Sequence, residues 1–215
     1  MRHLLGNAVL RHGSSKANVG RLTVGLLILL LPAMARAHAG GADAGLAGAL
    51  MHPVSGLDHL LAMISVGVVS VQLGSANVWR IPATFICAMA AGTALGIAQW
   101  LLPHVELGIA ASVLVLGLGI VVARRHVPAW PIIAMVLIFG ACHGYAHGLE
   151  IPGSANPALF TLGLLISTSA LHVCGVLVGQ LTTRQSWLGR GIRLAGGVVA
   201  ASGVAFLLQA LGGIA

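Results

Sequence analysis

The sequence has very few charged or aromatic residues. Only 7% of its 215 residues are charged and 4% are aromatic, whereas soluble domains carry about 25% charged residues. Hydrophobic residues make up 58% of the chain, and the mean hydropathy is +0.99. This composition argues against a water-soluble globular protein. It predicts a helical membrane protein, because helices satisfy their own backbone hydrogen bonds in lipid.

Two further absences narrow the possible functions. The three cysteines, Cys87, Cys142 and Cys174, all lie in apolar segments and not in outer loops, so a disulfide framework is not expected. The sequence contains no GxxxxGK[ST] phosphate-binding loop, which argues against ATP hydrolysis.

The first 37 residues have the organisation of a secretory signal peptide. Five of the 11 basic residues lie there, around the short apolar run of residues 22–31. The small-residue site Ala35-Arg36-Ala37 predicts cleavage after Ala37 and a mature chain that begins at His38. Cleavage leaves six arginines against four acidic residues, so the net charge falls from +7 to +2. We therefore expect lipid, and no nucleic acid, as the macromolecular environment.

The mature chain, residues 38–215, contains six apolar segments of about the length that crosses a bilayer. They cover residues 53–73, 81–102, 107–122, 130–150, 157–180 and 191–212. We predict an all-α polytopic membrane protein with six transmembrane helices after a cleavable signal peptide. The short connections predict antiparallel neighbouring helices in one domain. Dense glycines, including Gly92-x-x-x-Gly96 and Gly175-x-x-x-Gly179, predict close helix packing.

The remaining arginines predict the orientation in the membrane. All six fall in or beside alternate connections, which are therefore expected to be cytoplasmic. They are Arg80, Arg124, Arg125, Arg184, Arg190 and Arg193. Both termini of the mature chain are then expected outside, which agrees with cleavage of a signal peptide.

The first predicted span opens with ionisable residues, which are expensive to bury in hydrocarbon. His52 is followed by five residues and then by Asp58-His59. In one continuous helix His52 and His59 would face the same way, but Pro53 suits the first turn of a helix and could leave His52 just outside the span. Either arrangement places this cluster near the outer surface.

A second cluster ends the fourth span. His143, His147 and Glu150 are spaced i, i+4 and i+7, which brings them onto one helix face. From the outer ends of the two spans, Asp58 and His59 lie about 8–9 Å deep, and His147 and His143 about 5 and 10 Å deep. Because the depths match, we expect the clusters to meet. Gly144 and Gly148 would allow another helix to approach the same segment closely.

Imidazoles with one or two carboxylates suit a divalent ion of the nickel, cobalt, copper or zinc group. Magnesium and calcium would prefer oxygen ligands. The alternative is a set of packing or interfacial histidines, but their shared depth and spacing favour a metal site. Asp58 could be a direct ligand, or it could orient a histidine from outside the coordination shell.

Three other residues are weaker candidates. His38 would present both an α-amine and an imidazole at the mature terminus, a pair that can chelate a divalent ion. His172, in the fifth predicted span, could be a second station on a path or a histidine bonded to a neighbouring helix. Cys142 adjoins His143 but points about 100° away on a helix, which argues against it as a ligand.

The two histidine motifs resemble those of the HupE/UreJ family of nickel/cobalt permeases. The family signatures are His-x5-Asp-His in the first helix and HGx(A/V)HGxE in the fourth, and this sequence matches both. Where the family often has Phe before the second motif, this chain has Cys142, which leaves the metal preference more open. The resemblance implies that six residues are needed for transport: His52, Asp58, His59, His143, His147 and Glu150.

Together these observations predict a permease of the bacterial cytoplasmic membrane. It would move Ni(II), with Co(II) as the second candidate ion, inward through a site between the first and fourth helices. The metal is the substrate, and no cofactor is expected. The alternative is an intramembrane zinc-dependent hydrolase that acts on a lipid or an amide. No HExxH motif supports that alternative, although membrane hydrolases need not use one.

Overall fold

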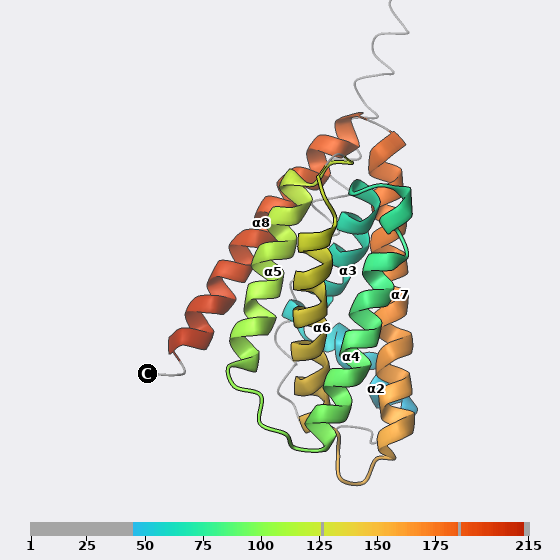
Figure 1. Cartoon of the computed structure of the whole chain (residues 1–215), viewed down its shortest axis with the longest axis vertical. Helices are drawn as coiled ribbons and strands as arrows, with labels where there is room; N and C mark the ends of the chain where they lie inside the picture. Colours follow the sequence, from blue (N-terminus) through green and yellow to red (C-terminus); the bar gives the residue numbers. More distant parts are fainter. Residues whose placement is uncertain (1–44, 126, 185, 213–215) are drawn as a thin grey trace, which may run out of the picture. The chain divides into compact units, whose positions relative to one another are not determined.

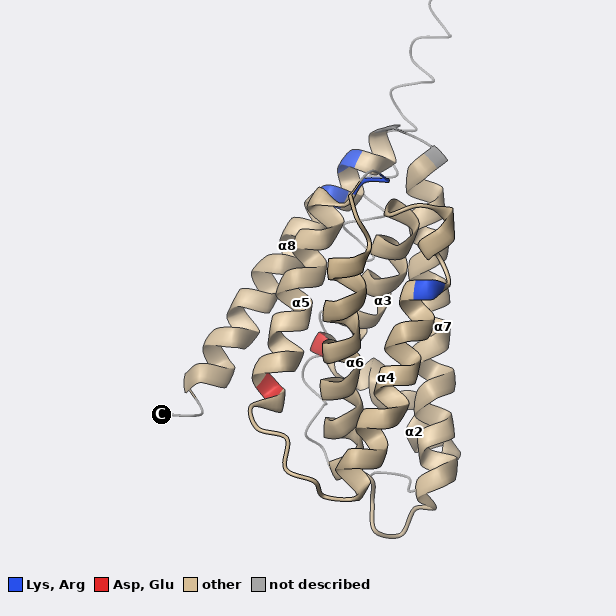
Figure 2. Ribbon diagram, viewed as in Figure 1, with Lys and Arg blue, Asp and Glu red and all other residues tan. Residues whose placement is uncertain are grey.

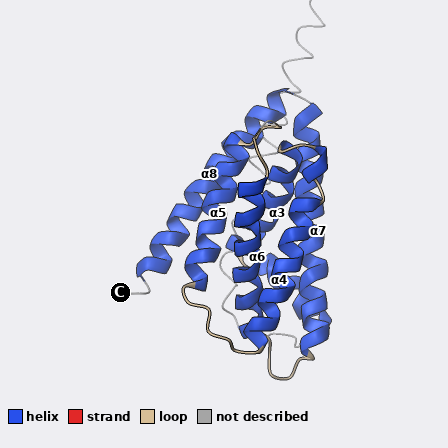
Figure 3. Ribbon diagram, in the orientation of Figure 1, coloured by secondary structure: helices blue, strands red, loops and turns tan. Residues whose placement is uncertain are grey.

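The computed structural model describes residues 45–125, 127–184 and 186–212, and all regular secondary structure in these ranges is helical (Figures 1 and 3). The predicted signal peptide and His38 lie outside the described residues. The elements are α2 (Leu46–Ser55), α3 (Leu57–Gln72), the short 3-10 helix η2 (Ser75–Asn77), α4 (Arg80–Ile97), α5 (Val105–Val122), α6 (Trp130–Leu149), α7 (Pro157–Arg184) and α8 (Ser186–Gly212).

Five helical segments in the described part of the chain are long and apolar enough to cross a membrane. They are Ser75–Ile97, Val105–Val122, Trp130–Leu149, Pro157–Thr183 and Trp187–Gly212. A sixth crossing is possible only if α2 and α3 together form one broken span, because the two helices are bent by 83°. The last five predicted spans therefore correspond to single helices, and the first does not.

The first predicted span was expected to begin at Pro53 and continue to residue 73. Instead Pro53 lies inside α2, and the chain breaks at Gly56, whose backbone is extended (φ −91°, ψ 122°). The break occurs where Asp58 and His59 fold back: a Cβ at Gly56 would lie 2.9 Å from Asp58 Oδ1 and 3.1 Å from His59 Nδ1. A larger residue at position 56 would push these two side chains out of their observed positions. His52 and His59 therefore belong to different helices.

The most extensive helix contact joins α4 and α6, which Figure 1 shows side by side and running in the same direction. Consecutive helices alternate in direction, but the α4–α6 and α3–α7 pairs are neither consecutive in sequence nor antiparallel. Lipid provides no hydrophobic drive for helices to associate, so close contact at small residues takes its place.

Glycines on both helices form the α4–α6 contact. A Cβ at Gly144 would overlap the carbonyl oxygen of Met89, and one at Gly92 would overlap that of Ala141. The glycines of α6 recur every four residues, at 140, 144 and 148, and all three face α4. This geometry confirms the close approach predicted from the small residues.

The arginines gather at one end of the helices. They lie where α4 begins, where α5 and α7 end, and where α8 begins. Figure 2 shows the basic residues of the described part toward this end and the visible acidic residues farther from it. We call it the arginine end. The distribution has the one-sided form that the positive-inside rule describes.

The α4–α6 contact can be tested with two glycine substitutions. Gly144→Ala should destabilise the protein by about 1–3 kcal/mol, because the methyl group has no space against the α4 backbone. The matched control is Gly197→Ala on α8, where an added Cβ meets no atom within 4 Å. Thermal unfolding in detergent should show a lower Tm for Gly144→Ala and an unchanged or higher Tm for the control. Equal Tm values for the two variants would contradict this account.

Candidate functional site

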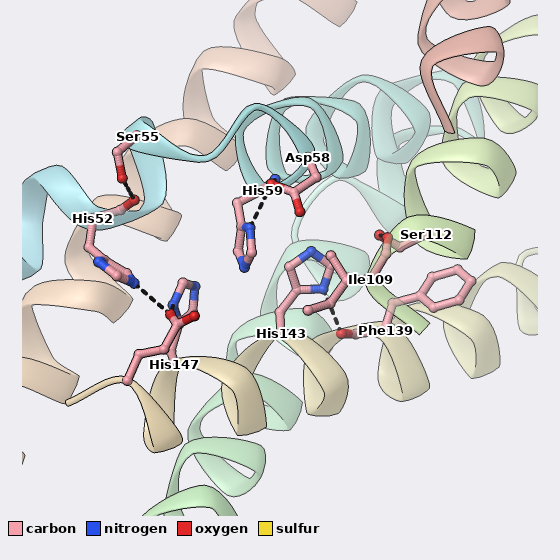
Figure 4. A network of polar contacts seen from close by, with 10 residues as sticks. His52, Ser55, Asp58, His59, Ile109, Ser112, Phe139, His143 and His147 are labelled. Atoms are coloured by element: carbon pink, nitrogen blue, oxygen red, sulfur yellow. Dashed lines mark hydrogen bonds and ion pairs between the residues drawn. The ribbon is translucent and has the colours of Figure 1, made fainter. Parts of the chain in front are cut away.

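Four imidazoles from two distant parts of the chain lie against one another (Figure 4). The ring centroids of His52 and His147 are 4.9 Å apart, those of His147 and His59 4.6 Å, and those of His59 and His143 4.8 Å. Asp58 and Glu150 contact the same rings, so the structure brings together six of the seven residues predicted as site residues. We call these six residues the histidine cluster. The seventh, His38, lies outside the described residues.

The second motif positions its histidines through the glycines beside them. Successive residues of an α-helix are turned by about 100°, so a face that carries Gly144 and Gly148 lies next to a face that carries His143 and His147. The glycine face is pressed against α4, which directs the histidine face toward α2 and α3. Cys142 packs against α5 instead: its thiol is the group closest to the position that a Cβ at Gly108 would occupy.

Hydrogen bonds set the tautomers of two imidazoles. Nδ1 of His59 lies 2.9 Å from Asp58 Oδ1, and Nδ1 of His143 lies 2.8 Å from the carbonyl oxygen of Phe139. A carboxylate and a carbonyl only accept, so each Nδ1 carries the proton and each Nε2 keeps its lone pair. The backbone N–H of His59 also donates to Asp58 Oδ1 at 2.9 Å. Here Asp58 orients His59, which is one of the two roles predicted for it.

The lone pairs that remain have no partner among the described residues. They belong to Nε2 of His59, Nε2 of His143 and the unprotonated nitrogen of His147. His143 and His147 are 0% and 1% exposed, so bulk water does not reach them. A buried polar atom without a partner costs about 1–3 kcal/mol. These atoms lie on rings that contact one another, and a divalent cation is a partner that accepts several lone pairs at once.

Glu150 closes the cluster on its more exposed side. His52 Nε2 lies 2.9 Å from Glu150 Oε2, and His147 Nδ1 lies 3.7 Å from the same oxygen. The imidazoles of His147 and His52 hold the pKa of the Glu150 carboxyl well below its usual range. One ligand atom from each of these three residues falls within 4.8 Å of the others, close enough for one ion to contact all three. The carboxylate would offset part of the charge of that ion.

One aromatic side chain beside the histidine cluster was not predicted from the sequence. The ring of Phe85 on α4 is 0% exposed and lies 5.5 Å from the His143 ring, between centroids. The same ring contacts His172, at 5.1 Å between centroids and an interplanar angle of 90°. His172 is therefore not part of the histidine cluster. Phe85 carries no signal in the sequence, because one phenylalanine in an apolar helix looks the same wherever its ring points.

Comparisons with known proteins give a family match and a similar protein. The sequence profile of the "HupE / UreJ protein" family matches residues 26–206. Protein HupE of Rhizobium leguminosarum bv. viciae is 42% identical over 193 residues, which cover 87% of this chain and 97% of that protein. No solved structure matches the chain.

The orienting role of Asp58 predicts a defined loss of metal affinity. Asp58→Asn removes the carboxylate that holds Nδ1 of His59 in its protonated form. Affinity for Ni(II) or Co(II) should fall about 10–100-fold, as is usual when a partner that orients a ligand histidine is lost. Equilibrium binding to the purified protein in detergent measures the change. An unchanged affinity would show that the Asp58–His59 pair has no part in metal binding.

Proposed function

Because this chain belongs to the HupE / UreJ family, which is associated with nickel and cobalt transport, we propose that it is a secondary transporter of Ni(II), with Co(II) as the second candidate ion. The observation that carries this proposal is the set of buried imidazole nitrogens without partners, arranged around two carboxylates. Imidazole and carboxylate together form the donor set that such ions accept. The metal is the substrate, and no resident cofactor is needed.

Side-chain exposure supports a direction of entry into the histidine cluster. The side chain of Glu150 is 55% exposed and that of His52 is 32% exposed, whereas that of His147 is only 1% exposed. A hydrated ion would first meet the carboxylate of Glu150, which attracts positive charge, and would then exchange water for imidazole nitrogens. Ligands must be strong enough to replace water and weak enough to let the ion leave.

The position of the histidine cluster relative to the arginine end supports inward transport. Glu150 follows the end of α6 opposite to the arginine end. If the arginine end faces the cytoplasm, the histidine cluster opens on the outer side of the bacterial cytoplasmic membrane. The membrane potential then favours inward movement by about 2.3 kcal/mol per charge per 100 mV, or about 4.6 kcal/mol for a divalent ion. The zinc-hydrolase alternative gains no support from the family assignment.

Uptake of Ni(II) into proteoliposomes should depend on the central imidazoles. His59→Ala and His147→Ala should each abolish most of the uptake, because each removes a buried nitrogen donor at the centre of the cluster. The control is His104→Asn: His104 is exposed at the start of α5 with φ 57°, a conformation that Asn tolerates. Its uptake should match that of the wild type.

Two results would contradict the proposal. One is Ni(II) uptake that survives His59→Ala at normal protein levels. The other is zinc retained stoichiometrically by the purified protein together with hydrolysis of a lipid or an amide, which would favour the hydrolase.

Metal binding should weaken as the pH falls, and histidines should set the slope. An imidazole loses its donor lone pair on protonation, so protons compete with the ion and metal binding should weaken between about pH 7.5 and 5.5. Glu150 contributes no slope, because its pKa is lowered and the group stays ionised in that range. Binding titrations between about pH 7.5 and 5.5 test this.

The matched variant for the pH titration is Glu150→Gln. It should bind Ni(II) more weakly at every pH, because a negative charge beside the ion is lost, and should keep the slope of the wild type. A flat pH profile for the wild type would argue against imidazole ligands. A slope that disappears in Glu150→Gln would assign the titration to the carboxylate.

A further inference from the structure

His172 is a buried histidine that the histidine cluster does not use. It lies in the middle of α7, is 2% exposed, and neither ring nitrogen has a hydrogen-bond partner among the described residues. One of the two nitrogens of a neutral imidazole carries a proton and the other a lone pair, so both a donor and an acceptor are left unsatisfied. A histidine that served only to join two helices would be bonded to one of them. His172 has no such bond among the described residues, which gives no support to the hydrogen-bonded role considered for it from the sequence.

A second unsatisfied group lies one turn away on the same helix. Thr168 precedes His172 by four residues, so the two side chains share a face of α7. Thr168 is 0% exposed, and its hydroxyl also lacks a partner within the described part of the chain. Two other fully buried hydroxyls are bonded: Thr93 donates to the Met89 carbonyl at 2.9 Å and Ser112 to the Ile109 carbonyl at 2.6 Å. The hydroxyl of Thr168 is therefore available to a ligand.

His172 lies farther toward the arginine end than the histidine cluster. The backbone carbonyl of His172 faces Gly67 of α3, which follows His59 by eight residues, or about 12 Å along the helix. The Phe85 ring contacts both His143 and His172, so it lies next to both sites. His172 also lines a groove of about 290 Å³ between α4 and α7, which reaches Trp79 just before α4 begins. Open volume thus adjoins His172 between α4 and α7 and extends toward the arginine end.

We propose that His172 and Thr168 form a second station for the transported cation on α7, centred on His172 beside Phe85 and separate from the histidine cluster. This inference rests on the proposed transport function and extends it. An imidazole nitrogen and a hydroxyl oxygen are both acceptable to a divalent transition ion. They offer fewer protein ligands than the histidine cluster and no carboxylate. The second station therefore holds the ion more weakly, which favours onward release over return to the cluster.

The test separates metal binding from metal movement in the full chain. His172→Ala and Thr168→Val remove one donor each, and His172→Phe removes the nitrogens while keeping an aromatic ring against Phe85. The matched control on the same helix is Ser169→Ala, whose hydroxyl is already bonded to the Leu165 carbonyl at 2.6 Å. Each variant is purified, checked by thermal unfolding, assayed for equilibrium Ni(II) binding in detergent, and reconstituted for Ni(II) uptake.

We expect both His172 variants to bind Ni(II) at the histidine cluster with an affinity within about twofold of the wild type, because the two sites share no ligand. Their initial uptake rate at saturating Ni(II) should fall about tenfold or more, since an ion that leaves the cluster no longer finds the imidazole donor of His172. The uptake rate of Thr168→Val should fall less, and the uptake rate of Ser169→Ala should match that of the wild type.

Three results would overturn the second station. The first is wild-type uptake by His172→Phe, which would assign His172 to aromatic packing alone. The second is wild-type uptake by His172→Ala. The third is a parallel loss of binding and uptake in both folded His172 variants, which would mean that His172 supports the cluster. Failure of the wild type to bind or transport Ni(II) would instead overturn the proposed function, so the two failures are distinguishable.

Discussion

The close approach of α4 and α6 through glycine determines the geometry of the site. In lipid, apolar surface is not driven together as it is in water, so two helices associate where their backbones can come into contact. Gly140, Gly144 and Gly148 provide that contact on α6 and leave the helix little freedom to rotate. A helix whose rotation is set has its other faces set as well. His143 and His147 consequently point toward α2 and α3, although neither histidine contributes to the glycine contact.

The break at Gly56 completes the arrangement from the opposite side. Because α2 and α3 meet at 83°, His52 and His59 approach His147 from two helices. A straight helix would separate these residues by about 10 Å along its axis, too far apart to contact the same imidazole. The bend also places Asp58 in the first turn of α3, where the helix dipole favours a negative charge. The carboxylate can therefore remain ionised and hold His59 in one tautomer.

Much of this could be predicted from local sequence. Apolar length located the last five spans, and the i, i+4, i+7 spacing placed His143, His147 and Glu150 together, because both depend only on helix geometry. The start of the first span was wrong. Proline is a strong signal for a helix start, but Pro53 lies within α2. The chain breaks instead at Gly56, which the side chains of Asp58 and His59 approach closely. The position of the break depends on side-chain contacts, and the spacing of apolar residues along the sequence does not predict such contacts.

By itself, the sequence determined the helical class, the clustering of arginines between alternate spans and the two motifs that carry the candidate metal ligands, since composition and spacing act within one helix. Only the tertiary structure decided which imidazoles meet, which nitrogens are left without partners, and that Phe85 contacts both His143 and His172. Those features arise where α3, α4, α6 and α7 pack side by side. Their packing depends on how the surfaces of separate helices fit together, which is not a property of any single segment.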